Sequence, residues 1–149
     1  MGLDMYLYKS VYVGAHWKHR KVTGQINIYT DGEPINVDFK KVHEIVEDVA
    51  YWRKANQIHN WFVNNVQDGN DDCRRYYVDS EKLIELVDIC KRVRDDHSLA
   101  EELLPTQEGF FFGATDYGDG YYQDIEDTIE QLKDIDTDVY SSYYYESSW

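Results

Sequence analysis

Basic residues, cysteine and proline are all scarce in this chain of 149 residues. It has 15 lysines and arginines against 29 aspartates and glutamates, and only two cysteines and two prolines. The shortage of positive charge disfavours direct binding to nucleic acid or to an anionic membrane. Two cysteines are too few for a disulfide framework or a paired-cysteine zinc site. We therefore expect no nucleic-acid partner, no membrane partner and no bound metal.

Longer signatures are missing as well. No apolar run approaches the ~18 residues that a membrane helix needs, and the first residues lack the charged and then apolar pattern of a signal peptide. This predicts a cytoplasmic location. The sequence also contains no phosphate-binding glycine–lysine loop, zinc-protease helix or serine elbow. We accordingly predict a protein that is not an enzyme and that uses no cofactor.

The acidic residues that are present gather toward one end of the chain. Residues 1–30 carry a net charge of +3, residues 31–66 carry −2, residues 67–115 carry −6 and residues 116–149 carry −9. Charge of this size says little about the fold, but it favours association with basic protein surfaces. The C-terminal part of the chain is therefore the first place to look for a partner-binding surface.

Aromatic residues are abundant, which argues for a folded chain. The sequence has 14 tyrosines and four tryptophans, whereas disordered segments are poor in such residues. A chain of this length is typical of one domain, and we predict a single domain over residues 1–149.

The N-terminal half contains strand and helix patterns in succession. Alternating apolar residues predict strands over residues 3–13, 25–30 and 35–37, with a turn at 31–34, and we expect an antiparallel meander. Asp38 is a candidate N-cap for a helix that begins at Phe39. The apolar stripe changes face near residues 48–51, so we expect two helices there, the second ending at the turn 67–72.

The C-terminal half predicts two amphipathic helices and a final strand. The first helix begins at Asp79 or Ser80, and the second covers residues 121–135. Three phenylalanines between Gly109 and Gly113 suggest a buried strand, and residues 139–149 alternate as a strand that joins the N-terminal sheet. The fold class is α+β, with an antiparallel sheet from N-terminal strands plus a C-terminal strand, packed against three to four helices. The apolar positions of the first helix are Leu83, Leu86, Val87, Cys90 and Val93.

The last predicted helix carries a row of carboxylates on one face. Positions four apart rise about 6 Å along a helix, so the row presents regularly spaced negative charge and could imitate a phosphate backbone before a basic groove. The alternative is an ordinary solvated face. The candidate partner-binding residues are Glu126, Asp127, Glu130, Asp134, Asp136 and Asp138, with Tyr140 and Tyr144 supplying contact area.

Two other segments are candidates for binding. In the run 51–63, Arg53 and Asn56 could hold an anionic ligand beside His59, although a histidine among aromatics is more often part of the core. His16 and His19 lie in the basic loop 14–21, where a third metal ligand is missing. That loop is either a solvated hairpin loop or a contact for anions, including the acidic end of a second copy in a homodimer.

Three segments are distinctive: Tyr51–Val63, Leu104–Gly113 and Ser147–Trp149. Through them the chain resembles a family of small, mostly uncharacterised acidic proteins of phages and prophages. This resemblance implies a bacterial cytoplasm and carries no catalytic residues. By analogy with compact acidic phage proteins, it suggests an anti-defence inhibitor of a nuclease or CRISPR effector. The alternative is a protein that sequesters a nucleotide or another small ligand through Arg53 and Asn56.

Overall fold

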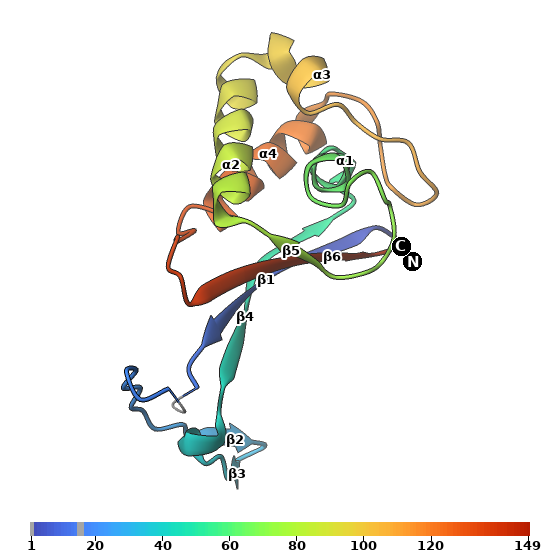
Figure 1. Cartoon of the computed structure of the whole chain (residues 1–149). Coiled ribbons are helices and arrows are strands. Elements are labelled where there is room, and N and C mark those ends of the chain that lie inside the picture. Colours follow the sequence, from blue (N-terminus) through green and yellow to red (C-terminus); the bar gives the residue numbers. More distant parts are fainter. Residues whose placement is uncertain (1, 15–16) are drawn as a thin grey trace.

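The computed structural model describes residues 2–14 and 17–149 and shows an antiparallel sheet with helices on one side (Figure 1). The four strands are β1 (Asp4–Tyr12), β4 (Glu44–Arg53), β5 (Tyr76–Val78) and β6 (Ser141–Ser148), in the order β4-β1-β6-β5. The helices are α1 (Asn56–Asn65), α2 (Ser80–Asp95), α3 (Ala100–Leu103) and α4 (Asp119–Gln131). The predicted α+β class is therefore confirmed, including the C-terminal strand beside the N-terminal one.

Strand β1 is the centre of the sheet because it pairs with β4 on one side and β6 on the other. Its side chains alternate as the sequence predicts, and Leu3, Met5 and Leu7 are fully buried. The pairing with β4 shifts after Leu7, and beyond that shift Ser10 is buried whereas Val11 is only half-buried. The extra residue is Val49 of β4, which has no partner in β1, and a bulge of this kind bends its strand and increases the local twist.

The core lies between the sheet and the helices. Helix α2 begins at the N-cap Asp79, whose carboxylate accepts a hydrogen bond from the Glu81 backbone N–H at 3.1 Å. All five of its predicted apolar positions are buried. Helix α4 packs against α2. The ring of Phe62 from α1 stacks on that of Tyr145 from β6, with 3.9 Å between centroids, and joins the helical layer to the sheet.

The predicted meander is wrong, because the second and third strands never join the main sheet. Strands β2 (Ile28–Thr30) and β3 (Glu33–Ile35) pair only with each other. Their turn is the predicted one, with Asp31 and Gly32 at positive φ. All six strand residues are exposed, and the hairpin lies at the end of the β1–β4 ribbon away from the helices (Figure 1).

The predicted helix over residues 39–49 is also wrong. Asp38 does act as a cap, but only for the 3-10 turn Phe39–Lys41, after which the chain continues as β4. Ile45, Val46 and Val49 are β-branched and fit a strand better than a helix. In β4, Ile45 and Val46 pair with Val11 and Ser10 of β1, and Val49 lies at the register shift between the two paired stretches. Long-range pairing therefore overrides the helical spacing of these residues.

The segment between Gly109 and Gly113 is a loop, not the buried strand that was predicted. Phe111 has φ +69° and Gly113 has φ +92°, and neither value is compatible with a strand. Phe110 is 82% exposed, whereas Phe112 is 4% exposed and packs edge-on against the His59 ring. In the predicted C-terminal strand over residues 139–149, Tyr143 and Tyr145 are buried, whereas Val139 and Trp149 are exposed.

Candidate functional site

Four of the predicted acidic residues lie together on α4 and in the turn that follows it. Glu126, Asp127, Glu130 and Asp134 are all exposed. Glu130 forms an ion pair with Lys133, and Asp127 accepts a hydrogen bond from Gln123 at 2.8 Å. In the part of the chain that the structure describes, the other two carboxylates have no ion-pair partner. The helix therefore presents a row of solvent-facing negative charge.

The remaining predicted contact residues are held by contacts within the chain. Asp136 forms an ion pair with Lys9 of β1, and that lysine lowers the pKa of the Asp136 carboxyl. Asp138 accepts a hydrogen bond from the Tyr140 backbone N–H at 2.8 Å. The Arg20 guanidinium lies 3.6 Å from the centroid of the Tyr140 ring. These contacts connect the residues just before β6 to β1, through Lys9, and to the segment 13–43, through Arg20.

Tyr144 also has a neighbour within the chain, because its ring meets Tyr77 of β5 edge-on at 6.0 Å. It is half-buried. Tyr140 directly precedes β6 and Tyr144 lies within it, so neither belongs to the row of carboxylates on α4 and in the turn after it.

The structure separates positive and negative charge in space. Residues 13–43, which include the projecting hairpin, contain five lysines and arginines and three acidic residues. The remainder contains ten lysines and arginines and 26 acidic residues, a net charge of −16. Among the described residues, no ion pair joins the projecting segment to the acidic side of α4. The negative field of the helical layer is therefore not neutralised by the basic loop of the same chain.

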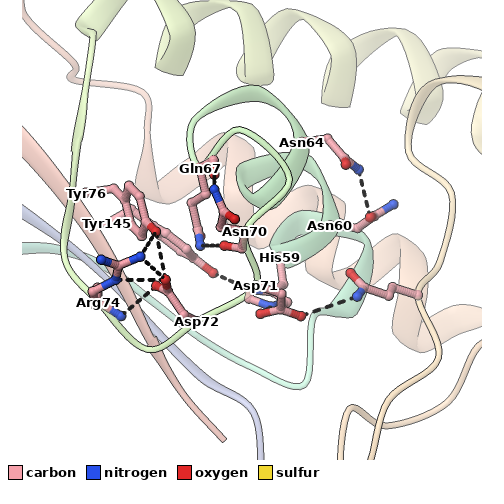
Figure 2. A network of polar contacts seen from close by, with 11 residues as sticks. His59, Asn60, Asn64, Gln67, Asn70, Asp71, Asp72, Arg74, Tyr76 and Tyr145 are labelled. Carbon is pink, nitrogen blue, oxygen red and sulfur yellow. Dashed lines mark hydrogen bonds and ion pairs between the residues drawn. The ribbon is translucent and has the colours of Figure 1, made fainter.

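His59 is a buried member of the polar network around the end of α1 (Figure 2). Its Nδ1 is 2.7 Å from the Tyr145 hydroxyl, and its Nε2 is 2.9 Å from Asp71 Oδ1. Burial lowers the pKa of His59, although the charge of Asp71 opposes the shift. A neutral ring satisfies both contacts if Nε2–H donates to Asp71 and the tyrosine hydroxyl donates to Nδ1. The ring is fully buried and both of its nitrogens are bonded, as in a structural core histidine.

Asn56 is likewise buried and connects α1 to the loop that follows α3. Its Nδ2 donates to the carbonyls of Phe112 and Ala114 at 3.1 and 2.8 Å, and its Oδ1 accepts from the Gln107 backbone N–H at 3.0 Å. One side chain therefore holds both sides of the loop. Its hydrogen-bonding groups face protein and are not available to a ligand in this conformation.

Arg53 is the one member of the predicted trio Arg53, Asn56 and His59 that lines an open cavity. The cavity has a volume of about 230 Å³ and lies between the end of β4, the start of α1 and the start of α4. Lys54, Gln57, Asp116 and Asp124 also line it. Sequence reasoning missed these four residues, because no local spacing connects residues 53–57 to residues 116–124.

Asp124 has an unusual environment in this cavity. Burial raises the pKa of its carboxyl to about 6, and a hydrogen bond from Gln57 Nε2 at 3.0 Å opposes the shift. Gln57 is 2% exposed and also donates to the Tyr121 carbonyl at 3.3 Å. Carboxyl groups with strongly shifted pKa values in clefts are candidates for functional sites.

The backbone around the cavity is strained. Lys54 has φ +58°, a left-handed conformation that is costly for residues with a Cβ. It faces Gly113, where an added Cβ would lie 3.0 Å from the Lys54 Cβ. Strained residues of this kind persist where the surrounding structure imposes them, and they concentrate at binding and active sites.

The acidic loop after α1 is paired internally. Asp72 forms an ion pair with Arg74, which lowers the pKa of the Asp72 carboxyl. Asp71 Oδ1 lies 2.9 Å from His59 Nε2 (Figure 2). Within the described ranges, no three His, Cys, Asp or Glu side chains gather in a way that could hold a metal ion. His16 of the predicted pair lies outside those ranges, and His19 is exposed.

Two further findings concern membrane-spanning helices and similarity to known proteins. Among the described residues, no helix is both long enough and apolar enough to cross a membrane. No protein-family model, curated protein or solved structure matches this chain.

Proposed function

We propose that this protein is a non-enzymatic inhibitor that binds the basic nucleic-acid-binding surface of a host defence nuclease or CRISPR effector. The observation that supports this most directly is the exposed row Glu126, Asp127, Glu130 and Asp134 on one side of the molecule. The row belongs to a part of the chain with a large excess of negative charge.

The row has an energetic consequence for the free protein. Like charges four residues apart on a helix destabilise it by roughly 0.2–0.5 kcal/mol per pair, and Glu126 and Glu130 on α4 have this spacing. Lys133 pairs with Glu130, whereas Glu126 has no ion-pair partner among the described residues. A basic partner surface would relieve the remaining repulsion, so binding converts an unfavourable feature of the free protein into a favourable contact.

The charge also affects how quickly a partner is found. Complementary potentials raise the rate of association more than they raise final affinity, and salt screens them within about 8–10 Å at ordinary ionic strength. We therefore expect association that weakens steeply as salt increases. The tyrosines along β6 are a second surface that could supply contact area once the complex has formed.

The test is a pull-down with the tagged protein from bacterial lysates that express defence systems, eluted with a salt gradient and identified by mass spectrometry. A basic nucleic-acid-binding protein should elute at moderate salt. The triple variant Glu126→Lys, Glu130→Lys, Asp134→Lys should lose that protein while its circular dichroism spectrum and melting temperature stay close to those of the wild type.

The matched control is Glu47→Lys, Glu101→Lys, Glu102→Lys. These three residues are exposed and, in the described structure, lack ion-pair partners, so this control changes the net charge equally at other places. It should retain most of the captured protein. If the α4 variant and the control bind equally well, the α4 row is not the binding surface and the proposal fails.

A further inference from the structure

The cavity beside Arg53 has walls of opposite charge. Arg53 and Lys54 come from the end of β4 and the residue after it, whereas Asp116 and Asp124 come from the loop before α4 and from α4 itself. Arg53 lies 3.5 Å from Asp4, outside the cavity lining. Within the described structure, no ion pair connects the two cations to the two cavity carboxylates. The opposite charges are therefore held apart across the cavity.

The acidic wall is held in place before any ligand arrives. Gln57, which is almost completely buried, donates to Asp124 Oδ2 and to the Tyr121 carbonyl. This fixes the carboxylate and leaves Oδ1 without a hydrogen bond among the described residues. An oxygen with a fixed position and a free acceptor site in a cavity is suited to receive an N–H group.

Two costs converge at this cavity. Keeping the half-buried Asp124 carboxylate ionised is unfavourable, because burial removes water from the charged form. Holding Lys54 in a left-handed conformation is also unfavourable. Both residues line the cavity, and the Lys54 backbone is held in place by hydrogen bonds from its N–H to the Leu3 carbonyl at 2.8 Å and from the Asn56 N–H to its carbonyl at 2.9 Å. A ligand with hydrogen-bond donors for the Asp124 carboxylate would offset the desolvation of that group. An anionic group on the same ligand would pair with Lys54, whose position the left-handed backbone fixes.

We propose that this cavity binds a small dipolar molecule, with an anionic group against Arg53 and Lys54 and an N–H or ammonium group against Asp116 and Asp124. The volume of about 230 Å³ lies below the ~300–1,000 Å³ typical of drug-sized ligands. Free α-amino acids have this chemistry and the smaller size, whereas nucleoside monophosphates have the same two kinds of group but would extend beyond the open cavity. The site is independent of the acidic row on α4 and goes beyond the proposed inhibitor function.

The experiment measures binding by isothermal titration calorimetry and by the shift in melting temperature. The dipolar probes are the twenty α-amino acids and the four ribonucleoside monophosphates, each at millimolar concentration. Inorganic phosphate is the anion-only probe and ethylamine the cation-only probe. At least one dipolar probe should bind, and bind at least tenfold more tightly than either single-function probe. The class of probe that binds identifies the source of the ligand.

Two variants test the walls separately. Lys54→Gly removes the cation and places glycine at a positive φ, which favours the folded state. Asp124→Asn removes the negative charge but keeps an oxygen that can accept from Gln57. Each should weaken binding of the dipolar probe at least tenfold, whereas the control Lys21→Ala, an exposed lysine on the projecting segment, should not change it.

Three outcomes would overturn the inference: no dipolar probe binds, phosphate alone binds as well as any dipolar probe, or both variants bind like the wild type. The pull-down used for the inhibitor proposal keeps the two ideas distinct. Lys54→Gly should retain the captured protein, because Lys54 is not part of the α4 row. Loss of ligand binding with retained capture would assign the two functions to different surfaces.

Discussion

Replacing Asp124 by asparagine should stabilise the protein at neutral and alkaline pH. The carboxyl has a pKa of about 6 in the folded chain, compared with about 3.9 for an unperturbed aspartate. Asparagine has nearly the same shape, carries no charge, and can still accept the hydrogen bond from Gln57. The substitution therefore removes a desolvated charge without opening a cavity.

The magnitude follows from linkage between protonation and folding. A shift of about 2 pKa units corresponds to about 3 kcal/mol at 1.36 kcal/mol per unit, and this is an upper limit. Asp124 is only half-buried, and solvent screening reduces the value, so we expect a gain of about 1–2 kcal/mol at pH 8. For a domain of this size that is a rise in melting temperature of ~2–8 °C.

The direction in which the stability difference changes with pH tests this reasoning more strictly than its magnitude does. Because the folded-state pKa is raised, the folded protein binds more protons than the unfolded chain between pH 3.9 and 6. The wild-type contribution of Asp124 to stability is therefore favourable at low pH and is lost as pH rises through 6. The difference between variant and wild type should consequently be largest at pH 8 and close to zero near pH 4.

Urea denaturation at a series of pH values, followed by circular dichroism, measures this difference. The control is Asp88→Asn, which removes one charge at an exposed position on α2 and should change the free energy of unfolding by no more than ~0.5 kcal/mol. A variant that is no more stable than the wild type at pH 8, or a difference that does not change with pH, would refute the reasoning about Asp124.

Four further substitutions test the core around the loop and the histidine. His59→Ala should lower the free energy of unfolding by about 2–4 kcal/mol in urea titrations, because it leaves a cavity and removes the partner of a buried tyrosine hydroxyl. Asn56→Ala should release the loop 105–117, detected as faster proteolysis there and as faster hydrogen exchange, whereas unchanged rates would show that the side chain does not hold the loop. Phe112→Ala should cost about 3–5 kcal/mol, while Phe110→Ala, at an 82% exposed position, should stay within ~0.5 kcal/mol. Equal effects of the two phenylalanine substitutions in the same thermal melts would contradict the loop conformation described above.

Local patterns were sufficient wherever an element buries one regular face. The helical spacing from Leu83 to Val93 and the cap at Asp79 determined α2, since a helix of 16 residues with one apolar face has one way to pack. Period-two alternation likewise determined β1 and β6. The acidic α4 row could be identified from the sequence because charged side chains on a helix face follow directly from residue spacing.

Local patterns failed where a distant partner decided the conformation. Residues 45–49 have helical spacing, but 45–48 pair with β1 in an antiparallel ladder that resumes at Ala50, and β-branched residues lose little by becoming a strand. The three phenylalanines from 110 to 112 suggested a strand, but Asn56 and the left-handed residues of the loop hold them in a turn that buries only Phe112.

The sequence by itself determined that this is an acidic α+β chain with a carboxylate row near its C-terminus, because composition and periodicity are properties of neighbouring residues. Only the tertiary structure decided that Asn56 and His59 are core residues and that Arg53 and Lys54 face Asp116 and Asp124 across one cavity. The two cations lie 62 to 71 positions from the two carboxylates in the chain. No local spacing predicts that they share a cavity, because the packing of α4 beside β4 brings them together. The raised pKa of Asp124 has the same origin, because desolvation exists only once the surrounding elements have packed.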